Sequence, residues 1–204
     1  MNLDLKNAYE TAIKFAHAHT DITIDLLRIL SALVMKNTGK EYKTALGDFS
    51  SAQGDLRLLN ITAGVGGKSY MNYSKVPVKL ADFCTWLNHE RKNYASKGIT
   101  QLYELGFEAH YHLVTIHPWA DGNGRMARLV MNMLQFEFGL IPTKILKDDK
   151  EEYINDLKTL NLGLEVRPKS KAGLLSGGQR HALTLLMATL VKPKLLLLDE
   201  HTAS

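Results

Sequence analysis

Apolar residues recur at the spacing of an amphipathic helix along most of the first 160 residues, and this pattern limits the fold more than any other feature of the sequence. Leu26, Leu30 and Leu33, for example, fall at i, i+4 and i+7 and so share one helical face. Asp21 is the predicted N-cap of that helix, and Gly39 stands where a glycine would end it. The periodicity predicts helices over residues 3–18, 21–36, 79–92, 100–116, 124–138 and 149–160. We therefore expect a mainly α fold.

Residues 40–78 interrupt this helical pattern with Gly, Ser, Asn and Pro. The short apolar run at 58–61 precedes several glycines, which together predict a loop or hairpin with its tip at residues 64–69. Residues 67–69 read Gly-Lys-Ser, like the end of a P-loop, but the first glycine of that motif would fall at position 62, which is Thr62. No helical pattern follows directly, so we interpret the segment as the tip of a hairpin.

The end of the chain has a different character. Residues 170–178 are small, polar and glycine-rich, a helix is predicted at 179–191, and four leucines at 195–198 precede Asp199 and Glu200. A short apolar run of this kind is typical of a strand buried on both faces. Lys and Arg number 19 against 18 acids before residue 161, but 6 against 3 after it. We predict one domain over residues 1–155 and a short α/β fragment over 156–204.

Composition excludes several classes of protein. The net charge is only +4, and no stripe of basic residues alternates with aromatics, so we expect no nucleic-acid partner. The single cysteine, Cys84, excludes an internal disulfide and suits a reducing compartment. The first residues lack the apolar run of a secretory signal, and the longest apolar stretch, at 182–198, is interrupted by Pro193 and its flanking lysines. We therefore expect a cytoplasmic protein without a membrane span.

Residues 117–128, which read HPWADGNGRMAR, combine a turn with the start of a helix. Pro118 discourages continuation of the preceding helix, and Gly122-Asn123-Gly124 tolerates unusual backbone angles. The free N–H groups at the positive end of the next helix form an anion site. Arg125 and Arg128, three residues apart, place two cations on the same side of its first turn.

Two further side chains in this segment complete a set suited to phosphate chemistry. Asp121 offers the hard oxygen ligand that Mg²⁺ shares with phosphate groups. His117 is the group in the segment that accepts a proton near neutral pH. Each of these residues alone would more often be structural, but their combination within twelve residues favours a functional site.

This segment resembles the signature of the Fic family, His-x-Phe-x-Asp/Glu-Gly-Asn-Gly-Arg-x-x-Arg, with Trp119 in the Phe position. The resemblance covers about residues 1–155 and includes Gly54 and Arg57, which match a Gly-x-x-Arg segment ahead of a substrate-positioning flap. It implies a helical bundle with a small β-hairpin flap and transfer of AMP from ATP to a hydroxyl side chain of a protein. His117 would be the general base, and Asp121 would hold Mg²⁺ between the α and β phosphates.

The resemblance also implies how the other motif residues bind ATP. Gly122, Asn123 and Gly124 would surround phosphate oxygens, with Asn123 at the α-phosphate. Arg125 would contact the β-phosphate and Arg128 the γ-phosphate. Many family members carry a regulatory helix whose glutamate pairs with the last arginine, in a pattern that ends Glu-Gly or Glu-Asn. No glutamate in this sequence is followed by Gly or Asn, so we expect Arg128 to be free for ATP.

The end of the chain resembles an ABC-type ATPase. Residues 175–180, LSGGQR, are similar to its signature motif, and residues 195–200, LLLLDE, to its Walker B strand and catalytic glutamate. Because the sequence holds no P-loop, we expect no ATP hydrolysis that depends on Asp199 or Glu200.

The function predicted from the sequence is thus Mg²⁺-dependent AMPylation of a protein target. The chain itself is one candidate for that target. Further candidate partners are a second copy of the chain and a regulatory protein. One alternative is an ATP-binding or interaction protein without transfer activity, and another is a fragment of an ABC-type ATP-binding subunit.

Overall fold

A computed structural model describes residues 3–62, 67 and 69–143 of the 204-residue chain. The chain divides into two units, Met1–Ile141 and Pro142–Ser204, and all the described helices and strands belong to the first. The predicted helices at 149–160 and 179–191, the strand at 195–198 and the domain boundary near residue 155 lie outside the described residues. The boundary and the tail elements therefore stay predictions.

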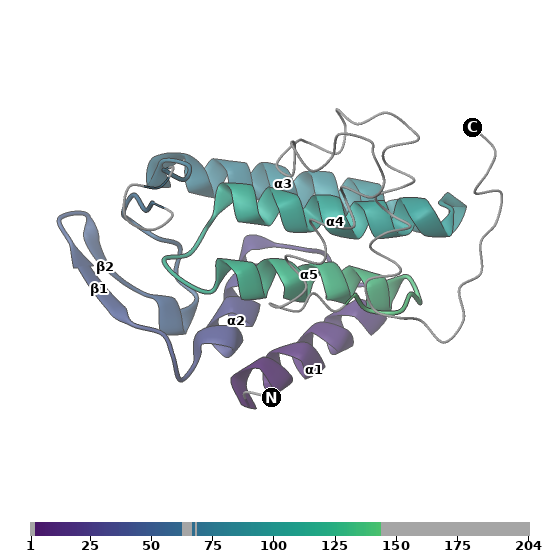
Figure 1. Cartoon of the computed structure of the whole chain (residues 1–204), viewed down its shortest axis with the longest axis horizontal. Coiled ribbons are helices and arrows are strands. Elements are labelled where there is room, and N and C mark those ends of the chain that lie inside the picture. Colours follow the sequence, from purple (N-terminus) through teal and green to yellow (C-terminus); the bar gives the residue numbers. More distant parts are fainter. Residues whose placement is uncertain (1–2, 63–66, 68, 144–204) are drawn as a thin grey trace. The chain divides into compact units, whose positions relative to one another are not determined.

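The first unit is built from five α-helices around one apolar core (Figure 1). The helices are α1 Leu3–His17, α2 Ile24–Met35, α3 Val76–Lys92, α4 Ile99–Ile116 and α5 Asn123–Glu137. α5 is the central helix, because it packs against both α4 and α1 and its residues are buried on nearly every side from Met126 to Gln135. Since a helix buried all round is held firmly in place, α5 is a rigid support for whatever its N-terminus carries.

The structure confirms the helical predictions within the described part and corrects one cap. Thr23, not Asp21, is the N-cap of α2: its hydroxyl accepts a hydrogen bond from the Leu26 N–H at 3.1 Å. Gly39 does follow the helix, but it is glycine for a packing reason, since a Cβ there would lie 2.4 Å from the Ala52 nitrogen. Cys84 is buried, and burial raises the pKa of its thiol to about 11.

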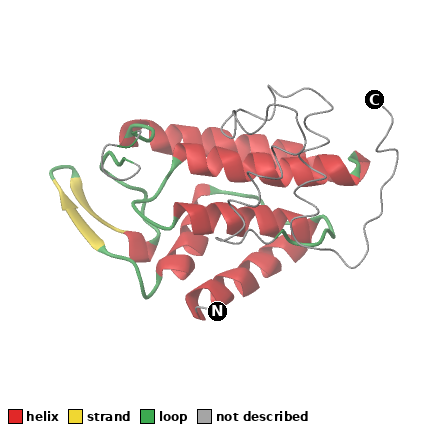
Figure 2. Cartoon of the chain, in the orientation of Figure 1, coloured by secondary structure: helices red, strands yellow, loops and turns green. Residues whose placement is uncertain are grey.

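Two hairpin-like segments lie between α2 and α3. Strands β1 Glu41–Thr44 and β2 Gly47–Ser50 pair antiparallel and are the yellow elements of Figure 2. Tyr42 and Phe49 are paired across them and stack with ring centroids 4.7 Å apart. The second segment is the predicted flap: Thr62 and Ser69 form an isolated antiparallel bridge, and most of the tip between them lies outside the described residues.

A buried ion pair joins the elements at the end of the unit away from residues 117–124. The Arg91 guanidinium on α3 donates two hydrogen bonds to the Glu137 carboxylate on α5, at 2.9 and 2.8 Å. It also donates to the Asn88 side chain and to the Thr20 carbonyl between α1 and α2. The two charged side chains are only 6% and 3% exposed, so this contact is part of the core.

No helix in the described part of the chain is long and apolar enough to cross a membrane.

Candidate functional site

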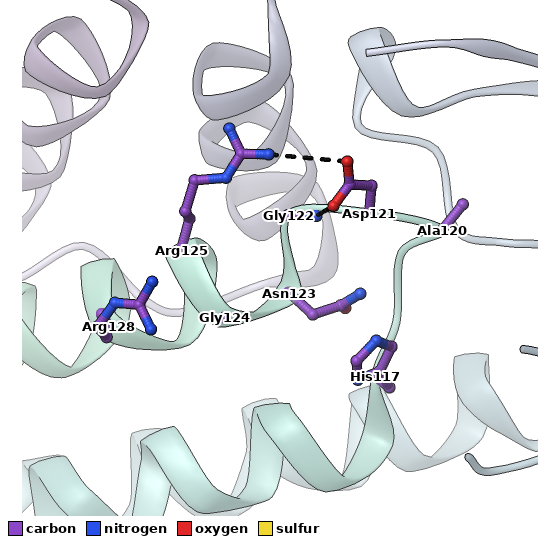
Figure 3. Close-up of a pocket in the computed structure, with 8 residues that line it drawn as sticks. All are labelled: His117, Ala120, Asp121, Gly122, Asn123, Gly124, Arg125 and Arg128. Atoms are coloured by element: carbon purple, nitrogen blue, oxygen red, sulfur yellow. Dashed lines mark hydrogen bonds and ion pairs between the residues drawn. The ribbon is translucent and has the colours of Figure 1, made fainter. Parts of the chain in front are cut away.

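The residues predicted to act together lie around one open pocket of about 300 Å³ between the end of α4 and the start of α5 (Figure 3). All seven predicted site residues line it, together with Ala120: they are His117, Asp121, Gly122, Asn123, Gly124, Arg125 and Arg128. The first helical N–H groups of α5 open onto this pocket, and such groups have no acceptor within their own helix. The pocket therefore offers N–H donors and two arginines to an anion.

The turn at the base of the pocket depends on Gly122 and Asn123. Gly122 adopts φ +81°, and a Cβ at this position would lie 2.7 Å from the Met35 sulfur, so both the backbone and the packing require glycine. The buried Asn123 amide accepts a hydrogen bond from the Trp119 N–H at 3.0 Å and donates one to the Trp119 carbonyl at 2.8 Å. Asn123 thus closes the loop, and its amide retains one further N–H for a ligand.

Trp119 anchors this loop in the core. Its side chain is fully buried, and the indole N–H donates to the Gly54 carbonyl at 3.2 Å. Gly54 has φ +73°, and a Cβ there would lie 2.1 Å from the Arg28 carbonyl oxygen. The hydrogen bond between Trp119 and Gly54, which lie far apart in the sequence, therefore holds the loop against the core.

His117 ends α4 in a left-handed conformation with φ +54°. Its Nδ1 lies 3.3 Å from the Val114 carbonyl, which can only accept a hydrogen bond, so we assign the proton of the neutral ring to Nδ1. Burial lowers the pKa of His117, and the nearby Arg57 charge lowers it further, against opposing effects of Val114 and Asp121. The ring is therefore neutral at pH 7, with an unprotonated Nε2.

Asp121 and Arg125 lie at the rim of the pocket. One Asp121 oxygen accepts the Gly122 N–H at 2.6 Å, and the other lies 3.9 Å from the Arg125 guanidinium. The Arg125 guanidinium contacts the C-terminal end of α2, with Nη2 2.9 Å from the Met35 sulfur and Nη1 3.5 Å from the Val34 carbonyl. Both side chains are thus held near the pocket without a tight mutual ion pair.

Arg128 lies one turn further along α5, and its guanidinium makes no hydrogen bond or ion pair with the residues that the structure describes. That Arg128 is free for ATP stays a prediction. Its charge contributes to lowering the pKa of His110 on α4, after the larger effect of burial.

Sequence reasoning assigned no role to Arg57, although it lies beside the site. Its side chain is 1% exposed, and its Nε donates to the His117 carbonyl at 2.7 Å. Its backbone N–H donates to the next carbonyl, that of Pro118, at 3.0 Å. The Gly-x-x-Arg pattern was the available signal, but a contact across 60 residues of sequence cannot be read from spacing.

The donor set around the pocket suits a cation that arrives with a phosphate ligand. No group of three or more metal-ligating side chains occurs among the described residues. Asp121, however, is 63% exposed at its side chain and presents one oxygen that no close hydrogen bond occupies. Mg²⁺ is commonly bound by one or two carboxylates plus substrate phosphates, and Asp121 beside the anion site fits that arrangement.

Fold and site together define a helical domain with a pocket at the N-terminus of its central helix, lined by two arginines and a histidine. The chain belongs to the Fic/DOC family, whose family model matches residues 21–135. A second family model, for ABC transporters, matches residues 90–203, so the chain also carries an ABC-like fragment. The two matches overlap over residues 90–135, where the described elements include α4 and α5.

Curated proteins similar to this chain include the protein adenylyltransferase Fic of Drosophila mojavensis, 37% identical over 106 residues. The protein adenylyltransferase fic-1 of Caenorhabditis briggsae is 39% identical over 90 residues. These matches cover 51% and 44% of this chain. The chain spans only about a fifth of the length of these relatives, 20% and 17%.

Solved structures of two similar proteins share the fold. A Fic domain containing signaling protein from Bacteroides thetaiotaomicron superposes with a TM-score of 0.61 at 22% identity, covering 92% of this chain and 65% of the other. Fic-1 residues 134–508 from Caenorhabditis elegans superposes with a TM-score of 0.56 at 23% identity, covering 90% and 48%. These likenesses confirm the mainly helical Fic fold that the sequence predicted.

Proposed function

We propose that this domain transfers AMP from ATP to the hydroxyl group of a Ser, Thr or Tyr side chain on a protein. The observation that supports this best is the pocket at the start of α5, where a neutral histidine, two arginines, a carboxylate and free helix N–H groups meet. The similar proteins named adenylyltransferase support the same reaction. We also propose that this catalytic domain ends near residue 155, before the ABC-like fragment.

In the proposed reaction His117 is the general base. Its Nδ1 is held by the Val114 carbonyl, so Nε2 is the atom that takes the proton from the target hydroxyl. The hydroxyl oxygen forms a bond to the α-phosphorus, and the bond from that phosphorus to the oxygen bridging to the β-phosphate breaks. Pyrophosphate leaves with the bonding electron pair, and the AMP remains on the target.

The phosphates of ATP would be bound by the α5 N-terminus and its arginines. We place the α-phosphate at Asn123, between Gly122 and Gly124, the β-phosphate at Arg125 and the γ-phosphate at Arg128, as the resemblance to the Fic family implies; all of these residues line the pocket. Phosphoryl transfer requires mainly positioning and stabilisation of charge. A rigid buried helix with unsatisfied donors at one end meets both needs.

Asp121 would hold the Mg²⁺ that accompanies ATP. This cation would neutralise charge on the phosphate oxygens while pyrophosphate leaves. The target would pair along the flap, since a hairpin edge recognises an extended segment through main-chain hydrogen bonds. The antiparallel bridge between Thr62 and Ser69 provides the base of that edge.

The test incubates the protein with a cell lysate, Mg²⁺ and ATP labelled at either the α- or the γ-phosphate. We expect labelled protein only from the α-position, and its loss in His117→Ala. The control is His89→Ala, a histidine on α3 whose side chain is 76% exposed, and it retains labelling. Labelled protein from the γ-position would show that the protein transfers phosphate and not AMP. ATP binding without label from either position would indicate a nucleotide-binding protein that transfers nothing.

A further inference from the structure

Arg57 is a buried cation that contacts three separate segments of the chain. Its Nε donates to the His117 carbonyl at 2.7 Å and its Nη1 to the Leu59 carbonyl at 2.7 Å. Its Nη2 donates to the Met71 carbonyl. Leu59 and Met71 are the points at which the chain enters and leaves the flap, whose bridge lies between Thr62 and Ser69. One guanidinium thus joins both ends of the flap to the residue proposed as base.

No acidic side chain among the described residues forms an ion pair with Arg57. Burying a charge without a partner of opposite sign costs free energy, and three carbonyl dipoles offset only part of that cost. Arg91, the other buried arginine, has a bidentate carboxylate partner. The burial of Arg57 without such a partner therefore calls for a role beyond holding the fold together.

The contacts of Arg57 fix the backbone on which the His117 ring is carried. The last carbonyls of a helix lack N–H donors within it. Here the His117 carbonyl accepts a hydrogen bond from the Arg57 side chain, and the next carbonyl, that of Pro118, accepts one from the Arg57 backbone N–H. His117 has a positive φ, a conformation that costs free energy in a residue with a Cβ and needs support from its surroundings.

The flap supports the same residue from the side of the ring. Tyr70, which directly precedes Met71, stacks on His117 with ring centroids 3.6 Å apart and planes inclined by 23°. The Tyr70 N–H donates to the Ile61 carbonyl at 3.0 Å, so the ring of Tyr70 is placed by the base of the flap. Arg57 holds the main chain of His117, and the segment bound to Arg57 holds its ring.

We propose that Arg57 is a positioning residue for His117: it fixes the main chain of the base and ties it to the two ends of the flap, so that flap and base are oriented together. This inference rests on the proposed AMP transfer for its effect on rate. The structural part, that Arg57 sets the conformation and surroundings of His117, is testable whether or not AMP is transferred.

The experiment compares Arg57→Gln and Arg57→Lys with Arg91→Lys as a control for loss of a buried guanidinium. Three quantities are measured for each folded variant: the pH titration of the His117 ring by NMR, the dissociation constant of ATP, and the rate of α-label transfer at saturating ATP. The NMR signal of His117 is identified by its absence in His117→Ala. We expect both Arg57 variants to lower the transfer rate on the order of 100-fold, because displacing a catalytic group by about 1 Å has effects of that size. The dissociation constant of ATP stays unchanged, since Arg57 does not line the pocket.

The two Arg57 variants separate geometry from charge. Arg57→Gln removes the charge that lowers the His117 pKa, so the titration midpoint of His117 moves upward. Arg57→Lys keeps the charge but cannot reach three carbonyls with one ammonium, so the rate falls while the midpoint stays. The Lys variant carries the test if the Gln variant does not fold.

A purely structural role would give a different result, in which the transfer rate falls only with the folded fraction and Arg91→Lys behaves in the same way. That result, or an unchanged His117 titration in folded Arg57→Gln, overturns the inference. If the wild-type protein transfers no AMP at all, the proposed function fails, and the His117 titration still decides the inference about Arg57.

Discussion

The two buried arginines of this domain show how its two ends differ. Arg91 on α3 contacts the C-terminal end of α5, where Glu137 neutralises it through two hydrogen bonds. Arg57 lies near the N-terminal end of the same helix and is bound by carbonyl groups alone among the described residues. Positive charge is therefore balanced within the protein at one end of the helix and left in excess at the other.

The excess lies where an anion is expected. Arg128 has no acidic partner among the described residues, and Arg125 has only a carboxylate oxygen at 3.9 Å. The dipole of α5 adds further positive potential at this end. An end built for stability pairs its charges, whereas an end built to bind phosphates leaves them available.

The largest effect is expected from breaking the paired end. Arg91→Met removes both guanidinium hydrogen bonds from the buried Glu137 carboxylate, which keeps only the His19 ring at 3.1 Å, and should lower the free energy of unfolding by about 3–5 kcal/mol. Urea unfolding measures this loss. The double variant Arg91→Met, Glu137→Leu should regain most of the stability, because it removes both charges. A double variant as unstable as the single one would contradict the assignment of the loss to an unpaired charge.

A smaller effect, on binding rather than stability, is expected at the unpaired end. Arg128→Ala removes a cation with no partner in the described part of the chain, so the unfolding free energy should hardly change. ATP should bind roughly 10- to 100-fold more weakly, the size of a charged hydrogen bond. Calorimetric titration with ATP measures this, with Lys79→Ala, an exposed lysine on α3, as control. If Arg128→Ala instead increased AMP transfer, an acidic side chain would be shown to block Arg128.

The glycine turn that shapes the unpaired end should show a still smaller cost. Gly122→Ala forces a Cβ into a positive φ and against the Met35 sulfur, and we expect a loss of about 1–2 kcal/mol in unfolding free energy together with weaker ATP binding. Gly139→Ala is the matched control, because Gly139 also has a positive φ but nothing lies within 4 Å of its Cβ position. Equal losses in the two variants would show that the contact with Met35 contributes nothing.

The sequence predicted what depends on local patterns. Helical periodicity located all five described helices, and the residues of the pocket lie within one continuous segment, 117–128, whose turn and helix start could be read directly. The hairpin β1–β2 was not placed within the 40–78 segment, because its strands have four residues each and are largely exposed, so that no alternation of buried apolar residues marks them.

Contacts between distant segments were not predictable from these patterns. Arg57 reaches His117 across 60 residues, and Trp119 reaches Gly54 across 65. Thr23 rather than Asp21 caps α2, because the helix begins at Ile24 and the Thr23 hydroxyl accepts a hydrogen bond from the Leu26 N–H. Such contacts decide how the site is held, while the local motif decides what it contains.

The smallest effect concerns the pH dependence of AMP transfer, which is set by the titration of His117 at the N-terminal end of α5. Burial lowers the pKa of His117 below its ordinary value of 6.5, so the folded protein holds the ring in its neutral, proton-accepting form at neutral pH. AMP transfer should therefore be nearly constant between about pH 7 and 8 and fall only as the pH drops through the lowered pKa, below 6.5. The rate of α-label transfer at saturating ATP measures this profile.

The acid loss must come from His117 and not from unfolding, so circular dichroism is recorded over the same pH range. Arg57→Gln supplies the internal check, because loss of the nearby charge moves the midpoint of the profile to higher pH. A midpoint above 6.5 in the wild-type protein would mean that a nearby negative charge, such as Asp121 or the bound triphosphate, outweighs burial at His117. The excess of positive charge at this end of α5 would then be balanced once ATP binds, and the base would be tuned by its substrate and not by the fold.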